Sequence, residues 1–495
     1  MENDSIIMPK LIDLPENYKD DKHYIRIAKI TIKDFKSIEN GEIIFNCKKT
    51  DIGINSCSDI MGIYGQNGSG KTSVIEALSI LKFLLSGTSI PNQYAECIRI
   101  GCDYSRLSFT FDIQTDSLKK ETVVYSVSLR RQEQAVGQEE NDDSDEFGEN
   151  ERNRFRLVVF DEILEFAGPL DGKNWRLAQF INTDSEDYPF VPVSKYKELI
   201  TQDQKIKYKL SAIREVINEK ESRSFIFSPE LFSEIKDKNG YSDFYIILNN
   251  IRLYALEYFF VVDTKTSGWI RLNYMIPIFT DRGVLIIKDT RWMSKKRYNI
   301  YSRMISQINV VLSSLIPGLE LKLSVVSERK NKKGDDGFVA SLVSIRDGVE
   351  MPTRYESDGV RKIISILYLF SCAYNGPYTV AIDEFDAGIF EYLLGELLEI
   401  FEESGRGQFI FTSHNLRPLE VISNKFLYFT TTNPKNRFIH FKGLGSTNNL
   451  RTKYFREIML GSEQDEEIYK SSKRYKLKQA LMKANPMEGD IDEKQ

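Results

Sequence analysis

The stretch Gly65-Gln66-Asn67-Gly68-Ser69-Gly70-Lys71-Thr72 decides the expected fold. It has the spacing G-x-x-x-x-G-K-[ST] of a phosphate-binding loop. An apolar run at residues 60–64 precedes it, and a helical period follows it, carried by Val74, Ile75, Leu78, Leu81 and Leu85. Strand, glycine loop and helix in this order form an anion site, because the loop amides and the positive end of the helix dipole face the same ligand. We expect a nucleoside triphosphate site here rather than a chance glycine turn.

The residues of this loop have separate expected roles. Lys71 can reach the β- and γ-phosphates, where it also supports catalysis, and the Thr72 hydroxyl can ligate Mg²⁺. We expect ATP to contact the loop and the residue that follows it, namely Gly65, Gln66, Asn67, Gly68, Ser69, Gly70, Lys71, Thr72 and Ser73.

Bulk composition limits the class of protein. A chain of 495 residues predicts two or three lobes, and 67 basic against 72 acidic side chains give a net charge of −5, which argues against a strongly basic coat for nucleic acid. The five cysteines form no C-x-x-C pair, which favours a reduced protein without structural zinc. The polar first 20 residues are not a secretory signal, and no apolar run approaches about 18 residues. We therefore expect a cytoplasmic protein with no membrane partner.

The chain order predicts an α/β fold in several parts. Period-two alternation at residues 107–113 and 123–129 indicates antiparallel strands, and the acidic run 139–146 indicates a solvated loop between strands. Residues 205–220, 229–237 and 243–258 are candidate helices. The expected division is a flexible leader (1–23), an N-lobe with the glycine loop (24–180), a mostly helical insertion (181–312), a C-lobe (313–461) and a charged tail (462–495).

A second apolar run, at residues 378–382, ends in Asp383-Glu384. Carboxylates at the carboxyl edge of a parallel sheet lie beside a phosphate-binding loop, so Asp383 can hold Mg²⁺ and Glu384 can polarise a water in line with the γ-phosphate. A solvated strand end is the alternative, and the glycine loop in the same chain favours the site. His414 ends the next predicted strand, where its imidazole could hydrogen-bond the γ-phosphate and the attacking water, although such a histidine can also be structural.

Ser357-Asp358-Gly359 opens an apolar helix nearly 290 positions after Lys71. Because one molecule already has a complete phosphate cradle, this second helix N-terminus suggests a shared site, with Ser357 and Gly359 approaching the γ-phosphate held by another subunit. An ordinary helix capped by serine is the alternative, and spacing does not decide between them.

These stretches together resemble a known family. The ordered set is F-K-S at residues 35–37, G-Q-N-G-S-G-K-T, S-D-G, A-I-D-E-F-D-A-G and T-S-H-N. It is similar to the head of ABC-type ATPases of the SMC/RecF class, and within that class to the ATPases of bacterial antiphage systems such as OLD, abortive-infection, Septu and PARIS proteins. The resemblance implies an ABC-ATPase head, with a mixed P-loop sheet flanked by helices and an antiparallel β lobe. It also implies ATP and Mg²⁺ as ligands and a homodimer or higher oligomer.

The resemblance assigns roles to matching positions. Gly65 to Thr72 become Walker A, Asp383 and Glu384 Walker B, Ser357 and Gly359 the signature motif with Lys362 after it, Asp386 the D-loop aspartate and His414 the switch histidine. The signature departs from the family, because it reads E-S-D-G-V-R-K in place of L-S-G-G-Q. Gln114 and Gln132 are the two glutamines considered for the Q-loop. No nuclease-like cluster of carboxylates follows the ATPase, so we expect any effector, a nuclease, on another polypeptide.

Three basic clusters could contact nucleic acid, or could be ordinary solvated faces. They are Arg291-Trp292 with Lys295-Lys296-Arg297, Lys330 with Lys332-Lys333, and Lys470 with Lys473-Arg474-Lys476-Lys478. Three functions therefore stay open: an ATPase that dimerises around ATP and controls an effector in antiphage defence, a DNA-repair ATPase of RecF type, and a nucleotide-gated scaffold with negligible turnover. A transporter subunit is a weaker fit.

Overall fold

The computed structural model describes residues 24–45, 58–114, 120–134, 154–170, 172–239, 242–263, 275–278, 283–286, 290–441, 450–460, 467–469 and 474–484. The leader 1–23, the acidic run 139–146 and most of the tail 462–495 lie outside the described residues. Within the described ranges, no helix combines the length and apolarity needed to cross a bilayer.

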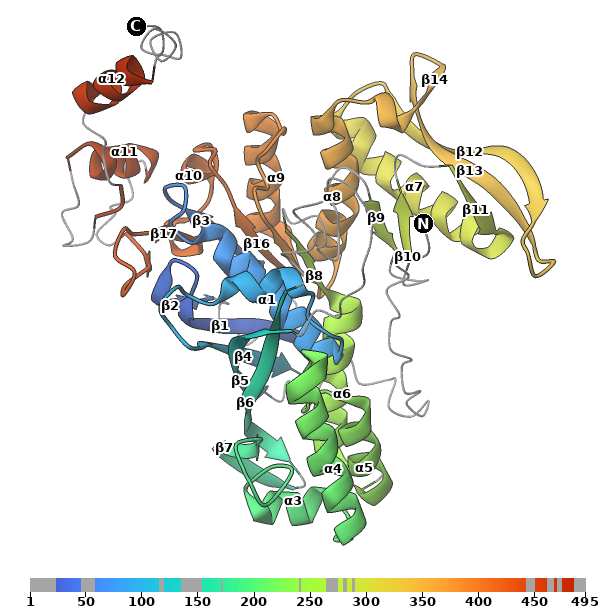
Figure 1. Cartoon of the computed structure of the whole chain (residues 1–495). Coiled ribbons are helices and arrows are strands. Elements are labelled where there is room, and N and C mark those ends of the chain that lie inside the picture. Colours follow the sequence, from blue (N-terminus) through green and yellow to red (C-terminus); the bar gives the residue numbers. More distant parts are fainter. Residues whose placement is uncertain are drawn as a thin grey trace, which may run out of the picture.

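A six-stranded sheet forms the centre of the molecule (Figure 1). Its order is β18 (Phe438–Ile439), β17 (Leu427–Thr430), β3 (Asp59–Tyr64), β16 (Gln408–Thr412), β15 (Thr379–Ile382) and β8 (Phe259–Val262). All neighbours are parallel except β18, which is antiparallel to β17. Every residue of the five parallel strands is buried, as expected of strands covered on both faces. The predicted apolar strands at residues 60–64 and 378–382, and the strand predicted before His414, are confirmed.

Helices cover this sheet and place the site at one edge. α1 (Lys71–Ser86) leaves β3 through the glycine loop and is buried at every position except Thr72. α8 (Asp358–Asn375) packs against β15 and β16, and α9 (Glu391–Ser404) follows β15 along the chain. Because β3, β15 and β16 are parallel, their carboxyl ends meet at the same edge. That edge therefore collects the glycine loop, the Asp383 turn and the His414 turn.

A second six-stranded sheet is antiparallel and forms the β lobe. Its order is β2 (Ile38–Ile44), β1 (Tyr24–Phe35), β4 (Ser105–Gln114), β5 (Lys120–Glu133), β6 (Phe155–Leu170) and β7 (Lys173–Asn182). β4 alternates between buried and partly buried residues, which confirms the period-two prediction. The fold is thus α/β, with a parallel P-loop sheet and an antiparallel β lobe, as expected.

The helical group of the chain lies to the right of and below the β lobe in Figure 1. It comprises α3 (Val193–Leu199), α4 (Gln204–Val216), α5 (Pro229–Asn239) and α6 (Asp243–Leu253), with short helical turns η4 (Ile217–Glu221) and η5 (Tyr254–Tyr258). The helices expected at residues 205–220, 229–237 and 243–258 are present. Residues 181–312 are more than a helical unit, however, because they also supply β8 to the central sheet.

A third sheet projects from the molecule beside α7 (Lys295–Leu315) (Figure 1). In it β13 (Asp336–Arg346) pairs with β12 (Leu319–Lys330), β11 (Arg291–Ser294) and β14 (Val349–Pro352). β14 leads through a short turn into α8, so this sheet is continuous with the signature motif. The remaining elements are η3 (Asn92–Cys97), β9 (Met275–Ile278), β10 (Gly283–Ile286), η6 (Thr353–Tyr355), α10 (Pro418–Val421), η7 (Asn424–Phe426), α11 (Leu450–Leu460) and α12 (Arg474–Lys483).

Candidate nucleotide site

The glycine loop has backbone angles that other residues rarely adopt. Gly65, Gly68 and Gly70 have φ values of 149°, 76° and 100°. A Cβ on Gly65 would lie 1.7 Å from the Thr430 hydroxyl, whereas one on Gly68 would meet nothing within 4 Å. Gly65 is therefore fixed by close packing against β17, and Gly68 borders open space that a phosphate could fill.

Lys71 begins α1 and folds back over its own loop. Its Nζ donates to the carbonyls of Gly65 and Gln66 at 2.8 and 3.1 Å. Burial lowers the pKa of Lys71, and three nearby carboxylates, on Asp383, Glu384 and Asp386, partly offset that effect. An ammonium has three N–H donors, so one remains for a phosphate oxygen.

Thr72 and Asp383 meet across 311 positions of sequence. The Thr72 hydroxyl lies 3.3 Å from Asp383 Oδ1. Thr412, the last residue of β16, donates to the same oxygen at 2.6 Å, and its hydroxyl also accepts from the backbone N–H of Glu384 at 2.8 Å. Hydroxyl and carboxylate oxygens are the ligands that Mg²⁺ prefers, so Thr72 and Asp383 fit a magnesium ion bound together with a triphosphate.

Glu384 is exposed and has a backbone φ of 48°, which is rare for a residue with a side chain. Two contacts hold this conformation: Thr412 binds the amide, and Lys362 Nζ from α8 donates to the carbonyl. Burial lowers the pKa of Lys362 to about 8, against the opposing effect of Asp386, Glu384 and Asp383. The backbone of Glu384 is thus fixed while its carboxylate remains accessible.

His414 lies on the same edge, after β16. Its backbone N–H and that of Asn415 donate to Asp386 Oδ2 at 3.0 and 2.9 Å, so Asp386 fixes the turn that carries the imidazole. The second oxygen of Asp386, Oδ1, is buried without a hydrogen-bond partner in the described structure. It is an acceptor for a donor from a ligand or from another chain.

These side chains surround one open pocket of about 450 Å³. The pocket is large enough for a triphosphate group and is lined mainly by polar atoms, from Asn67, Gly68, Lys71, Thr72, Glu384, Asp386, Ala387, Thr412 and His414. Lys71, Thr72, Glu384 and His414 were all singled out from the sequence, and the fold brings them together. Asp383 is buried directly behind Thr72.

Ser357 and Gly359 are not among the residues that line this pocket. Ser357 is exposed and caps α8, its hydroxyl accepting from the Val360 N–H at 3.3 Å. Gly359 packs on Gly388 of the D-loop, so closely that a Cβ on Gly359 would lie 2.2 Å from the Gly388 carbonyl oxygen. Within one chain the start of α8 therefore contacts the loop at Gly388 and leaves Ser357 open to solvent.

Two glutamines considered for the Q-loop lie elsewhere. Gln114 ends β4, and Gln132 on β5 accepts from Arg156 at 2.6 Å, so both belong to the antiparallel sheet. The neighbours of β15 are β16 and β8. The residue that follows β8 is Asp263, whose carboxylate accepts hydrogen bonds from the Ser79 and Tyr94 hydroxyls at 3.0 and 2.6 Å.

Sequence reasoning missed Thr412, which touches both Walker B residues. The sequence did contain an indication of this role, because Thr412 directly precedes Ser413-His414 at the end of a predicted buried strand. A hydroxyl there reaches the neighbouring strand only because β15 and β16 are adjacent and in register, with Ile382 opposite Phe411. Strand order is a property of the fold that a single sequence does not display.

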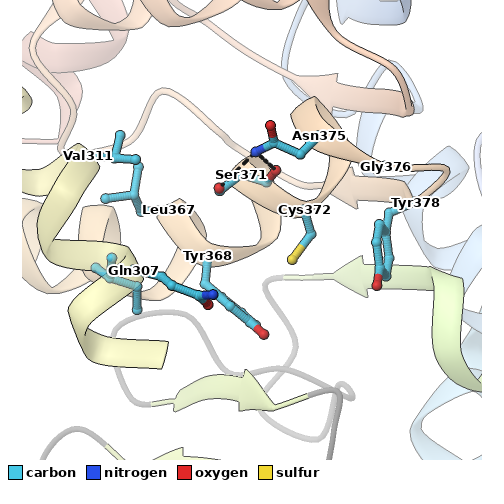
Figure 2. Close-up of a pocket in the computed structure, with 10 residues that line it drawn as sticks. Gln307, Val311, Leu367, Tyr368, Ser371, Cys372, Asn375, Gly376 and Tyr378 are labelled. Atoms are coloured by element: carbon cyan, nitrogen blue, oxygen red, sulfur yellow. Dashed lines mark hydrogen bonds between the residues drawn. The ribbon is translucent and has the colours of Figure 1, made fainter. Parts of the chain in front are cut away.

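A second pocket, of about 370 Å³, lies between α7 and α8 (Figure 2). Its lining includes Tyr368, Ser371, Cys372 and Asn375 from α8, with Asn375 hydrogen-bonded to Ser371. Burial raises the pKa of Cys372 to about 12, so its thiol is protonated and unreactive at neutral pH. None of the predicted phosphate-binding residues lines it. Of these two pockets in the described part of the chain, the one at the glycine loop is the candidate nucleotide site.

Comparisons with known proteins agree with a P-loop enzyme. Residues 29–241 match a family described as AAA domain, and residues 291–420 match one described as AAA domain, putative AbiEii toxin, Type IV TA system. A search of curated proteins gave no match. The chain thus carries the domains of a P-loop ATPase, a class that binds ATP with Mg²⁺.

Several solved structures are similar to this chain at low identity. The Smc head bound to the C-winged helix domain of ScpA is 14% identical, with a TM-score of 0.39 over 84% of this chain and 97% of that one. The Smc head with an extended coiled coil from Pyrococcus furiosus is 13% identical, with a TM-score of 0.37 over 84% and 96%. The recombination mediator RecF with ATP is 12% identical, with a TM-score of 0.31 over 79% and 94%.

Proposed function

We propose that two copies of this chain bind two Mg·ATP molecules between them and hydrolyse them. The observation that carries the proposal is the exposed end of α8: Ser357 is open to solvent, while Gly359 packs on Gly388 beside the pocket of the same chain. A helix N-terminus favours an anion, and the chain already has its own phosphate cradle. This arrangement supports a shared site, in which Ser357 of one copy approaches the γ-phosphate held by the glycine loop of the other.

The chain's own residues divide the work in this site. The loop amides and Lys71 bind the β- and γ-phosphates, and Thr72 and Asp383 would hold Mg²⁺. The metal, when bound, neutralises charge on the phosphate oxygens. The Glu384 carboxylate accepts a hydrogen bond from the attacking water and orients it, and the His414 imidazole hydrogen-bonds the γ-phosphate. Asp386 fixes the turn that carries His414 through its Oδ2.

The proposed cellular role is control of a separate effector, a nuclease, in antiphage defence in the cytoplasm. Two points support it: the motif set resembles the ATPases of such systems, and residues 291–420 match a family described as a putative AbiEii toxin of a Type IV toxin–antitoxin system. ATP-driven closure of two chains would change the surface that the effector contacts, so hydrolysis would release or activate it.

The replacement Glu384→Gln tests the proposal. The amide keeps the shape of the side chain but cannot accept a proton, so we expect ATP turnover to fall by about 100-fold or more while ATP is retained. Light scattering should then show an ATP-dependent dimer that persists for this variant and does not form for Lys71→Ala. Wild-type turnover in E384Q would refute the role of Glu384, and an unchanged monomer with bound ATP would refute the shared site.

A measurement of effector activity distinguishes a switch that needs ATP hydrolysis from a scaffold that needs only ATP binding. The effector is first co-purified with the tagged protein from its native host. If the activity of the effector changes with wild-type protein but not with E384Q, ATP hydrolysis is part of the control. If E384Q and wild type control the partner equally, the protein is a nucleotide-gated scaffold, and only the binding half of the proposal stands.

A further inference from the structure

The projecting sheet brings two basic clusters of the sequence onto one surface. We propose that this surface, the hairpin end of β12–β13 with β11 and the first turn of α7, binds the phosphate backbone of a nucleic acid. Strand β11 pairs with the start of β13, placing Ser294 opposite Gly337, and β12 pairs with the same start, placing Arg329 opposite Gly337 on the other side. Residues 291–297 and 328–336 therefore flank the same end of β13, although about 30 positions separate them.

The charge of this surface is opposite to that of the chain. Residues 291–297 contribute Arg291, Lys295, Lys296 and Arg297, all exposed. The hairpin end contributes Arg329, Lys330, Lys332 and Lys333, also exposed. Against these eight cations stand three acidic residues, Glu328, Asp335 and Asp336, which leaves a net charge of +5 on two short segments of a chain whose total is −5. A local excess of this size attracts polyanions.

The first turn of α7 is electrostatically unfavourable by itself. Ser294 caps the helix through the Arg297 N–H, and the turn that follows holds three cations and no acidic residue. The positive end of a helix dipole normally favours acidic side chains. Lys295, Lys296 and Arg297 at this end therefore repel the dipole and one another, and a bound anion would relieve that repulsion.

Aromatic contacts hold the surface rigid. Trp292 Nε1 donates to the carbonyl of Arg329 at 2.9 Å, and its ring packs on Gly337, where a Cβ would lie 2.6 Å from ring atoms. Tyr298 of α7 contacts Phe338, with ring centroids 4.9 Å apart. β11, the hairpin and α7 are thus one unit, which fixes the spacing of the cations before binding.

The shape favours a polymer over a free phosphate. The cations belong to β11, β12, the hairpin turn and the first turn of α7. These elements form the part of the structure that projects from the molecule (Figure 1). Cations spaced along β11, the hairpin end and the first turn of α7 can contact successive phosphates of a nucleic acid backbone. The proposal does not depend on ATP hydrolysis, and binding should be independent of base sequence.

Paired charge-removal variants test this surface. The full-length protein, with ATP present, is titrated with a labelled DNA duplex and a labelled single-stranded RNA of about 30 nucleotides, and anisotropy is followed against salt concentration. K332Q/K333Q and K295Q/K296Q should each weaken binding several-fold and reduce the slope of log K against log salt by about 2. The matched control K173Q/R176Q removes two exposed charges from β7 and should leave both quantities unchanged.

Three results would overturn the proposal. The first is that the wild-type protein binds neither DNA nor RNA. The second is that the β7 control loses as much binding affinity as the two test variants. A poly-glutamate peptide that binds this surface while DNA and RNA do not would assign it to an acidic protein partner instead. None of these outcomes bears on Glu384, so failure here is distinguishable from failure of the proposed ATPase.

Discussion

The hydroxyl of Thr412 lies 2.6 Å from Asp383 Oδ1 and also accepts the Glu384 N–H at 2.8 Å. One side chain therefore positions both acidic residues of Walker B, the residue that would hold Mg²⁺ and the residue that would orient water. Thr412 and Asp383 are both buried, so the hydrogen bond between their side chains is shielded from water.

Thr412→Val should damage catalysis more than folding. The valine keeps the shape of the side chain but removes the 2.6 Å hydroxyl donor to Asp383 Oδ1 and the acceptor for the Glu384 amide, at a cost of about 1–3 kcal/mol. We expect kcat for ATP to fall about tenfold or more and the requirement for Mg²⁺ to rise. Thr412→Ser retains the hydroxyl and serves as the control. Equal kinetics for the valine and serine variants would contradict the positioning role.

Gly359 tests the contact between the signature helix and the D-loop. In Gly359→Ala the new Cβ would meet the Gly388 carbonyl at 2.2 Å, so one of the two backbones must shift. ATP binding should persist, because Gly359 does not line the pocket, but ATP-dependent dimerisation should weaken at least tenfold.

A glycine pair gives this test its control. Gly388 and Gly348 have nearly equal φ values of 78° and 79°, but a Cβ on Gly388 would lie 3.1 Å from Gly359 Cα, whereas one on Gly348 would touch nothing. Both alanine variants share the backbone cost of about 1 kcal/mol. Only Gly388→Ala should impair dimerisation; equal behaviour of the two would assign the effect to backbone strain.

Lys362 is expected to act through the backbone of Glu384. Lys362→Met removes the donor to the Glu384 carbonyl and should lower kcat about tenfold with little change in KM, because Lys362 is not a pocket residue. Steady-state kinetics on this variant and on Lys362→Arg, which keeps a donor, measure the split. A rise in KM alone would mean that Lys362 supports nucleotide binding instead.

Much of the fold followed from local pattern. The apolar runs of β3, β15 and β16 and the alternation of β4 are visible in the sequence because burial sets their period. The placement of β8 was not visible, since its four residues follow helices and pair with β15, more than 100 positions away. Pairing of β11 with β13, which unites the two basic clusters, was hidden for the same reason.

The site was predictable to a similar degree. Sequence motifs identify the residues Lys71, Thr72, Asp383 and Glu384. The spacing of these motifs reflects the shape of a phosphate, so residue type and position can be predicted from the sequence. Thr412 and the Gly359–Gly388 contact depend on which strands and loops are neighbours. Such relations between distant segments come from topology, which the order of residues alone does not state.

The lowered pKa of the buried Lys82 predicts that the free energy of unfolding depends on pH. It is buried on α1, donates to the Phe259 carbonyl, and burial lowers its pKa from 10.5 to about 7. Between these two pH values the unfolded chain binds more protons than the folded one, so stability rises with pH across the window, by up to about 1.4 kcal/mol per unit, and this gain is absent below about pH 7. Urea denaturation from pH 6 to 9 should show a steeper rise for wild type than for Lys82→Met. Parallel curves would contradict the assignment.

The shared site itself can be tested by mixing two inactive proteins. Lys71→Ala removes the phosphate ligand from one half of the site, and Ser357→Arg places a bulky side chain at the exposed start of α8, which blocks the other half. If each site combines two chains, a heterodimer of the two variants has one intact site, and ATP turnover of an equal mixture should recover to at most about a quarter of the wild-type value. If each chain hydrolyses ATP by itself, the mixture will show no more turnover than the two variants measured separately, and the central claim fails.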